Sequence, residues 1–187
     1  MDNRQDRKSV CVFCSSSDGV DKAYYEAAAE LGREISKRGL TLVYGGSDIG
    51  LMGELARTVH KGGGKVVGII PKVLHGKVRP FNNYHELVVT DDLRHRKTLM
   101  ETRSDAFIIL PGGFGTLEEL LEIVTLKQLG HHTKPIVIIN TKSYYAPLLD
   151  MFEEMFKKEF ARSRYRDLYH VCADAAGAFK YLERAAL

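Results

Sequence analysis

Short apolar runs alternate with amphipathic segments along the whole chain, and this alternation limits the possible folds more than any other feature. The apolar runs occupy residues 10–14, 40–44, 65–70, 86–89, 106–110, 135–139 and 169–172. The intervening segments predict helices at 22–37, 50–60, 92–103, 116–129 and 144–160, and a last helix running to residue 187. Strands this uniformly apolar are covered on both faces. The pattern therefore predicts an α/β protein with a Rossmann-like, doubly wound, mostly parallel sheet flanked by helices.

The length and composition predict one domain. The chain has 187 residues, 44% of them hydrophobic, and a formal net charge of +3, which argues against intrinsic disorder. We expect a single domain at residues 9–187 after a polar, disordered tail at residues 1–8. The tail lacks a signal-peptide hydrophobic region, and no stretch approaches the roughly 20 apolar residues of a membrane span. Three cysteines are too few for a disulfide scaffold, so we predict a cytoplasmic protein without a membrane partner.

The distribution of charge gives no reason to expect a nucleic-acid partner. Lysines and arginines are mixed with acidic residues, as at residues 152–160, whereas nucleic-acid binders concentrate them in one stripe.

The cysteines and histidines do not form a recognisable metal site. Cys11 and Cys14 fall within one predicted strand, where a separation of three places them on opposite faces. His131 and His132 have no acidic ligand pattern around them. We therefore expect no metal and no cofactor, including pyridoxal phosphate.

The glycine-rich turns are the places to look for a ligand. In a doubly wound sheet, ligands bind beyond the carboxyl ends of the strands. The first turn, residues 15–19, contains Ser16 and other hydroxyl groups that either bond a ligand or only form the turn. The second turn, residues 44–53, is neither Gly-x-Gly-x-x-Gly nor a Walker A sequence. Its glycines, Gly45 and Gly46 first, either admit a ligand or allow close packing of helix on strand.

The third turn gives the most specific signal. A buried strand ends at Pro111, three glycines follow within four residues, and Thr116 is expected to open a helix. The unpaired N–H groups of a first helical turn favour an anion, and the 5′-phosphate of a nucleotide is the expected ligand. Glu118 and Glu119 are expected in that first turn. Glu119 and Glu122, at i and i+3, share a face and are candidates to point towards one ligand.

This third turn carries a family resemblance. Pro111-Gly-Gly-Phe-Gly-Thr-Leu-Glu-Glu119 resembles the Pro-Gly-Gly-x-Gly-Thr-x-x-Glu signature of the Lonely Guy (LOG) family, cytokinin-activating phosphoribohydrolases often labelled possible lysine decarboxylases. The resemblance extends over residues 9–185. It includes Leu42-Val-Tyr-Gly-Gly46, Gly50-Leu-Met-Gly53, Arg96-Lys97, Gln128-Leu-Gly130, Lys134-Pro135 and Tyr144-Tyr145.

The resemblance implies an activity and a set of residues. It implies hydrolysis of the N-glycosidic bond of an adenosine 5′-monophosphate, whose base is N6-modified, by a homodimer. The catalytic residues would be Arg96 and Glu119. The family's nucleotide-binding positions correspond to Lys97, Gly113, Phe114, Gly115, Thr116, Leu117, Glu118 and Thr125. The turns themselves add Ser16, Gly45, Gly46 and Gly112 as candidate substrate- and phosphate-binding residues.

Departures from the family pattern leave the substrate open. Ser15 and Ser47 replace glycines, and the family's Thr-Trp-Ala-Gln run is Thr125-Leu-Lys-Gln128 here, without its tryptophan. One alternative is an AMP nucleosidase of purine turnover, which differs only in its base pocket. Another is a non-catalytic carrier of a nucleotide or pterin cofactor, which would not need Arg96 together with Glu119.

Overall fold

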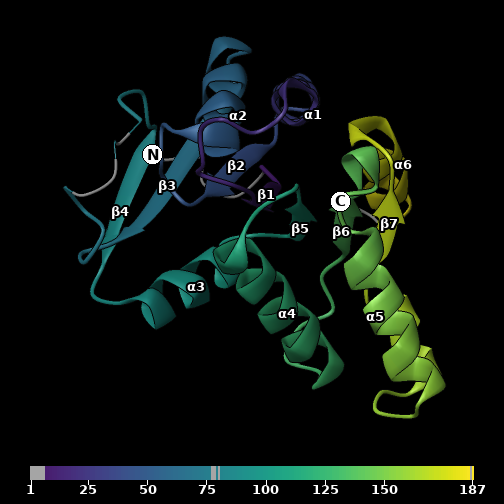
Figure 1. The fold of residues 1–187 in the computed structure, drawn as a ribbon. Coiled ribbons are helices and arrows are strands. Elements are labelled where there is room, and N and C mark those ends of the chain that lie inside the picture. The colour runs from purple at the N-terminus through teal and green to yellow at the C-terminus, as the bar shows by residue number, and fades with distance from the viewer. Residues whose placement is uncertain (1–6, 77–78, 80, 186) are drawn as a thin grey trace.

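The computed structural model describes residues 7–76, 79, 81–185 and 187, and it contains one open sheet with helices on both faces (Figure 1). The strands are β1 (Ser9–Phe13), β2 (Thr41–Tyr44), β3 (Lys65–Pro71), β4 (Glu86–Thr90), β5 (Ala106–Ile109), β6 (Ile136–Ile139) and β7 (His170–Cys172). The α-helices are α1 (Lys22–Lys37), α2 (Gly50–Lys61), α3 (Leu93–Thr102), α4 (Phe114–Gln128), α5 (Ala146–Lys157) and α6 (Ala175–Arg184).

All paired strands of the sheet are parallel, and their order is β4-β3-β2-β1-β5-β6-β7. The chain winds outwards from β1 in one direction through β2 to β4, then returns to the other side of β1 at β5. The order therefore reverses at β1, and the crevice at such a switch point is where doubly wound sheets bind ligands. The predicted Rossmann-like fold class is confirmed.

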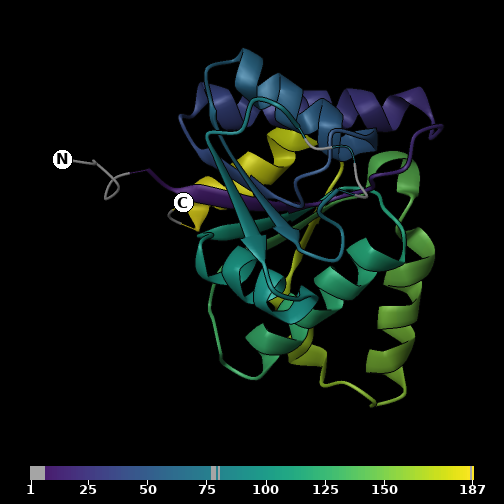
Figure 2. The same cartoon turned by 90° about the vertical axis from the view of Figure 1, so that its left-hand side faces the viewer.

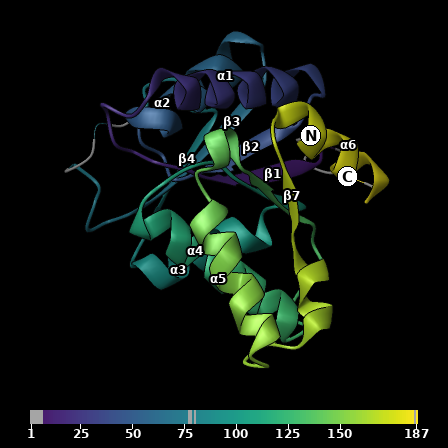
Figure 3. The ribbon, with the colours of Figure 1, turned by 45° about the vertical axis from the view of Figure 1, so that its right-hand side comes forward.

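Two apolar cores lie on the two faces of the sheet. Helices α1, α2 and α6 cover one face, and α3, α4 and α5 cover the other (Figure 3). Successive strand residues alternate between the cores, so Cys14 packs with the first layer and Cys11 with the second, as predicted. The start of β1 and the end of α6 lie side by side, at the end of the sheet opposite the carboxyl ends of the strands (Figure 2).

Several helix boundaries differ from the prediction. Helix α4 begins at Phe114 rather than at Thr116, because Gly113 takes the N-cap position, so Glu118 and Glu119 lie beyond the first turn. Helix α5 begins at Ala146, two residues late, since a 3₁₀ turn at Thr141–Ser143 precedes it. It ends at Lys157, before Glu159 adopts a left-handed φ of 60°.

The predicted tail at residues 1–8 lies largely outside the described residues. Within the part of the chain that the structure describes, no helix combines the length and the apolar character needed to cross a membrane. Residues between β3 and β4 form no further strand or helix where they are described, as expected from their content of Gly, Pro and Asn. We call residues 72–84 the β3–β4 excursion.

Candidate active site

A cavity of about 300 Å³ opens at the switch point, beyond the carboxyl ends of β1, β2 and β3. Three segments and three helices line it: the turn after β1, the turn after β2, the end of β3 with the excursion, and the N-terminal parts of α2, α3 and α4. The lining residues are Cys14, Ser15, Ser16, Ser17, Gly45, Ser47, Met52, Ile70, Leu74, Leu93, Arg96, Gly113, Gly115, Thr116 and Glu119.

Arg96 and Glu119 form an ion pair inside this cavity. Their side chains are only 10% and 7% exposed, and Arg96 Nη1 donates to Glu119 Oε1 at 2.7 Å. Arg96 Nε donates to the Ile69 carbonyl at 3.0 Å, so the guanidinium group is held in a fixed plane. Asp92 caps α3 through the His95 N–H and thereby fixes the turn that presents Arg96. Two charged residues 23 positions apart are thus brought together by the packing of α3 and α4 on one sheet face.

Burial raises the pKa of the Glu119 carboxyl above its ordinary value, and the charge of Arg96 opposes this rise. The other charged groups that act on it are Glu118, which also raises its pKa, and Lys97, which lowers it. The result is a desolvated carboxyl group that takes up a proton at a higher pH than a surface glutamate does. Perturbation of this kind, by burial and one specific charge, is typical of functional sites.

This perturbation predicts the pH dependence of any activity that needs ionised Glu119. A carboxyl with a raised pKa loses its charge at a higher pH, so activity should fall on acidification with a midpoint above 4.5, the ordinary value. The measurement is kcat against pH at saturating substrate, with refolded activity at neutral pH as a check against acid denaturation. Full activity at pH 4.5 would contradict the assignment.

The N-terminus of α4 supplies an anion site next to this pair. Gly113 is extended and makes no side-chain capping bond, and Leu117 N–H to Gly113 C=O begins the helical hydrogen-bond pattern. The amide groups before Leu117 are therefore left for a ligand. A hydrogen bond holds the turn before α4 in place, since the Tyr144 hydroxyl donates to the Gly112 carbonyl at 2.7 Å. Gly113, Gly115 and buried Thr116 line the cavity here.

The N-terminus of α2 has a different role. The Gly50 N–H donates to Asp18 Oδ1 at 3.1 Å, and the Met52 N–H donates to the Ser15 carbonyl at 3.1 Å. An added Cβ at Gly50 or Gly53 would lie within 2.6 Å of a neighbouring backbone oxygen. Of the two interpretations of this turn, close packing therefore applies to Gly50 and Gly53, and the protein's own groups occupy these amides.

Several predicted site residues lie outside the cavity. Phe114, Leu117, Glu118 and Thr125, with Lys97, lie instead on an adjoining exposed face of α3 and α4. Lys97 forms ion pairs with Glu118 and, at 2.6 Å, with Glu122. Glu122 therefore pairs with a lysine of α3, and it lines a smaller cavity of about 160 Å³ together with Glu119 and Lys97.

The remaining predicted glycines occupy the margin of the site. Gly112 lies behind the cavity, under Tyr144 and Thr116. Gly46 is covered by the side chains of Ile70 and Tyr84, and only Gly45 of this pair reaches the cavity. Ser16 lies at the cavity wall, with serines on both sides of it.

Sequence reasoning did not identify the apolar part of the site. Met52, Ile70, Leu74 and Leu93 are the large apolar side chains in the wall of the cavity. In the sequence these residues are indistinguishable from ordinary core or loop residues. In the structure, Leu74 and Leu93 differ from core residues because their side chains are partly exposed. Cys14 also reaches the cavity, but burial raises the pKa of its thiol far above the ordinary value, so it stays protonated.

Comparison with known proteins places this geometry in a family. The sequence model described as possible lysine decarboxylase matches residues 52–182. The chain is 45% identical over 161 residues to the probable cytokinin riboside 5′-monophosphate phosphoribohydrolase LOGL2 of Oryza sativa subsp. japonica, which covers 86% of this chain and 66% of the rice protein. It is 42% identical over 179 residues to the cytokinin riboside 5′-monophosphate phosphoribohydrolase LOG3 of Arabidopsis thaliana, covering 96% and 83% of the two chains.

A solved structure shares the fold over nearly the whole chain. The molybdenum cofactor binding protein of Rippkaea orientalis superposes with a TM-score of 0.74 at 16% identity, covering 97% of this chain and 99% of that one. At this identity the likeness concerns the fold alone. The sequence model and the relatives above 40% identity carry the assignment: this chain belongs to the LOG family, the family that the possible lysine decarboxylase model describes.

Proposed function

We propose that this protein is a phosphoribohydrolase that cleaves an N6-modified adenosine 5′-monophosphate into free base and ribose 5-phosphate. The observation that carries the proposal is the buried Arg96–Glu119 pair, which lies in one cavity with the open N-terminus of α4. The two plant relatives are named for the same reaction class, on cytokinin riboside 5′-monophosphates.

The geometry suits each part of such a substrate. The 5′-phosphate would bind the amides at the start of α4, where helix dipole and N–H groups favour an anion. The ribose would then lie over Arg96 and Glu119, and the base against the wall that contains Met52 and Leu74. A cavity of about 300 Å³ holds one nucleotide-sized ligand and leaves no room for a large second cofactor.

The chemistry requires a carboxylate beside C1′. As the bond from C1′ to the base nitrogen breaks, positive charge develops on the ribose, and an ionised carboxylate stabilises it and directs a water molecule. The water oxygen forms the new bond to C1′, and the departing base takes up a proton. Glu119 would supply the carboxylate. Arg96 would hold Glu119 ionised and in place through their charge-assisted hydrogen bond.

The direct test is product release from two nucleotides. Incubation with N6-isopentenyl-AMP and with AMP, followed by chromatography, should yield free base and ribose 5-phosphate, with the modified nucleotide preferred. Equal or greater turnover of AMP would instead favour the nucleosidase of purine turnover. If neither base is released while an active LOG enzyme works in parallel, the proposal is wrong. Intact recovery of tightly bound nucleotide would then favour a carrier.

Removal of the 5′-phosphate should strongly slow the reaction. The nucleoside N6-isopentenyladenosine leaves the helix N-terminus empty and loses the binding energy that holds C1′ over Glu119. Charge-assisted hydrogen bonds of about 1.5–3 kcal/mol each predict a loss of at least about 100-fold in kcat/KM. The measurement is base release from nucleoside and nucleotide at equal concentration. Similar rates for both would show that the N-terminus of α4 does not bind the 5′-phosphate.

We also propose a homodimer formed through the exposed face of α3 and α4. Phe114 is 92% exposed, and Leu121 on the same helix and Leu93 at the start of α3 are exposed as well. A shallow concavity of about 660 Å³ joins Phe114, Leu117, Leu121 and Leu126 on α4. Contiguous exposed apolar surface of this kind marks association sites. The proposed compartment is the cytoplasm, where the three free cysteines would stay reduced.

Substitution of Leu121 by Asp should convert the dimer to a monomer. A charge in the centre of the apolar face would have to be desolvated on association. Light scattering should give twice the 21.0 kDa chain mass for the unaltered protein and the single mass for the variant. Met151→Asp, an exposed apolar residue on α5, is the matched control and should leave the mass unchanged. A monomeric unaltered protein would contradict the proposal.

A further inference from the structure

The turn between β2 and α2, residues 45–48, forms one wall of the proposed active site. Its inner side touches the arginine: a Cβ added at Gly45 would lie 2.5 Å from Arg96 Nη2. Gly45 and Ser47 line the cavity, and Gly46 adopts a φ of 82° that presses the turn against Ile70. The backbone of this turn therefore sets how far the guanidinium group can move towards β2.

The guanidinium group of Arg96 is held on its other sides by hydrogen bonds. Nε donates to the Ile69 carbonyl at 3.0 Å and Nη1 donates to Glu119 at 2.7 Å. The third nitrogen, Nη2, has the Gly45 backbone as its close neighbour. A shift of the turn would thus either crowd the guanidinium group or let it rotate away from Glu119.

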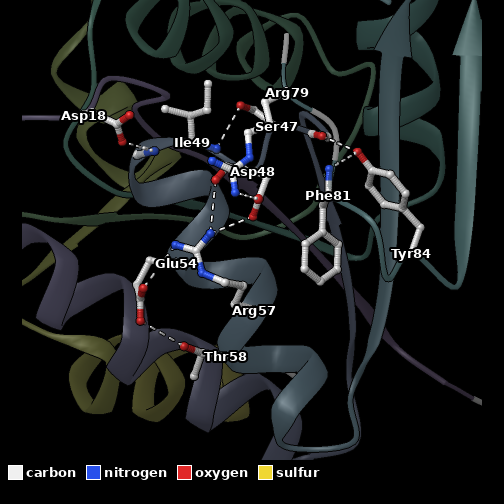
Figure 4. A network of polar contacts seen from close by, with 12 residues as sticks. Asp18, Ser47, Asp48, Ile49, Glu54, Arg57, Thr58, Arg79, Phe81 and Tyr84 are labelled. Atoms are coloured by element: carbon white, nitrogen blue, oxygen red, sulfur yellow. Dashed lines mark hydrogen bonds and ion pairs between the residues drawn. The ribbon is translucent and has the colours of Figure 1, made fainter. Parts of the chain in front are cut away.

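Asp48 fastens the outer side of the turn (Figure 4). Its carboxylate, 12% exposed, pairs with Arg57 Nη1 at 2.6 Å and with Arg79 Nη2 at 3.2 Å. Its backbone N–H donates to the Arg79 carbonyl at 2.9 Å, and its own carbonyl accepts from Arg57 Nη1 at 3.1 Å. One residue of the turn is therefore tied both to helix α2 and to the β3–β4 excursion.

Tyr84 provides a second attachment (Figure 4). Its hydroxyl donates to the Gly46 carbonyl and accepts the Phe81 N–H at 3.0 Å. Its ring is held in place because it packs directly on Gly68 of β3, where an added Cβ would lie 2.4 Å from the ring. The excursion is thus bonded to the turn at two points, Gly46 and Asp48.

We propose that Asp48 and Tyr84 are positioning residues for Arg96: they fix the outer side of the turn whose inner side determines where the guanidinium group lies. The proposal rests on the proposed hydrolase function, because its main readout is catalysis. Neither residue touches the cavity, so both act through Gly45 and Gly46. Surface ion pairs alone contribute little, but here the same acid also uses both of its backbone groups, which makes the attachment specific.

Two nearly isosteric variants test the proposal. Tyr84→Phe removes the hydrogen bonds to Gly46 and Phe81 and keeps the ring. Asp48→Asn weakens both ion pairs and keeps the volume. Each should lower kcat about 10-fold with KM changed less than about 2-fold, because small misplacement of a catalytic group costs more in the transition state than in binding. Rates are expressed per folded molecule from circular dichroism, so that reduced stability does not imitate the effect.

The pH profile separates positioning from a merely structural role. Arg96 lowers the pKa of Glu119, so a guanidinium group that moves away should let this pKa rise. The acid limb of kcat should therefore shift to higher pH in both variants. When the folded fraction is measured by circular dichroism at each pH and the rates are corrected for it, loss of stability alone leaves the midpoint of the limb unchanged.

Matched controls are available far from the site. Tyr181→Phe removes a hydroxyl from a ring that stacks on His170, and Glu153→Gln weakens an exposed pair with Arg166. Both should keep kcat, KM and the acid limb. If Asp48→Asn fails to fold, Arg79→Gln tests the same contact, since Arg79 is 73% exposed. It should lower kcat about 3-fold, in line with the loss of one partly exposed ion pair.

The outcomes distinguish the hydrolase function of the protein from the positioning role of Asp48 and Tyr84. An inactive unaltered protein that binds AMP by calorimetry contradicts the hydrolase function. An active unaltered protein whose Tyr84 and Asp48 variants keep both kcat and the acid limb overturns the positioning role. Reduced kcat with an upward shift of the limb supports it.

Discussion

Glu119→Gln should retain nucleotide binding and lose turnover. The amide keeps the shape and can still accept the hydrogen bond from Arg96, but it carries no charge to stabilise the developing positive charge at C1′. Loss of one preorganised electrostatic group costs about 10²–10³ in rate, and loss of water activation adds to this. We therefore expect kcat to fall at least about 1,000-fold, since the two rate factors multiply. The measurement is base release together with the dissociation constant for AMP by calorimetry.

The neighbouring acid provides the control for this substitution. Glu122 lies one helical turn further along α4 and pairs with Lys97 at 2.6 Å. Glu122→Gln removes the same charge from the same helix and should keep kcat within about 3-fold, as expected for a partly exposed ion pair. Substantial turnover by Glu119→Gln, or an equal loss of kcat in the two variants, would contradict a catalytic role for Glu119.

Arg96→Lys should lower kcat/KM by about 100-fold although it keeps the positive charge. A single ammonium group cannot reproduce the planar fork that bonds the Ile69 carbonyl and Glu119 at the same time. The Glu119 carboxyl would then be less well paired in a buried place, and its pKa should rise further. Steady-state kinetics across pH should therefore show both a slower reaction and an acid limb at higher pH.

Arg94 on the same helix is the matched control for this variant. It is exposed and lies outside the cavity, so Arg94→Lys should leave kcat/KM and the pH profile unchanged. If Arg96→Lys also keeps kcat/KM within about 3-fold, charge alone suffices at this position. That result would contradict both the fixed geometry of the guanidinium group and the positioning role of the turn beside it.

Most of the fold follows from local patterns in the sequence. Each predicted strand appears in the sheet, because runs such as residues 106–110 are apolar on both faces and need two covering layers. Helix ends were less accurate. The start of α4 depends on the backbone of Gly113, which leaves no side-chain signal, and the end of α5 depends on a left-handed turn at Glu159.

The layered α/β architecture and the family follow from the order of strands, helices and motifs along the chain, and the motifs also mark Arg96 and Glu119. Which motif residues share a cavity depends instead on how the helices and loops pack. This packing turns Lys97 towards Glu118 and Glu122, and it brings Leu74 to the site from a segment without a motif. The physical reason is that helical spacing fixes neighbours along one element, whereas contacts between elements depend on how α3, α4 and the β3–β4 excursion pack on the sheet.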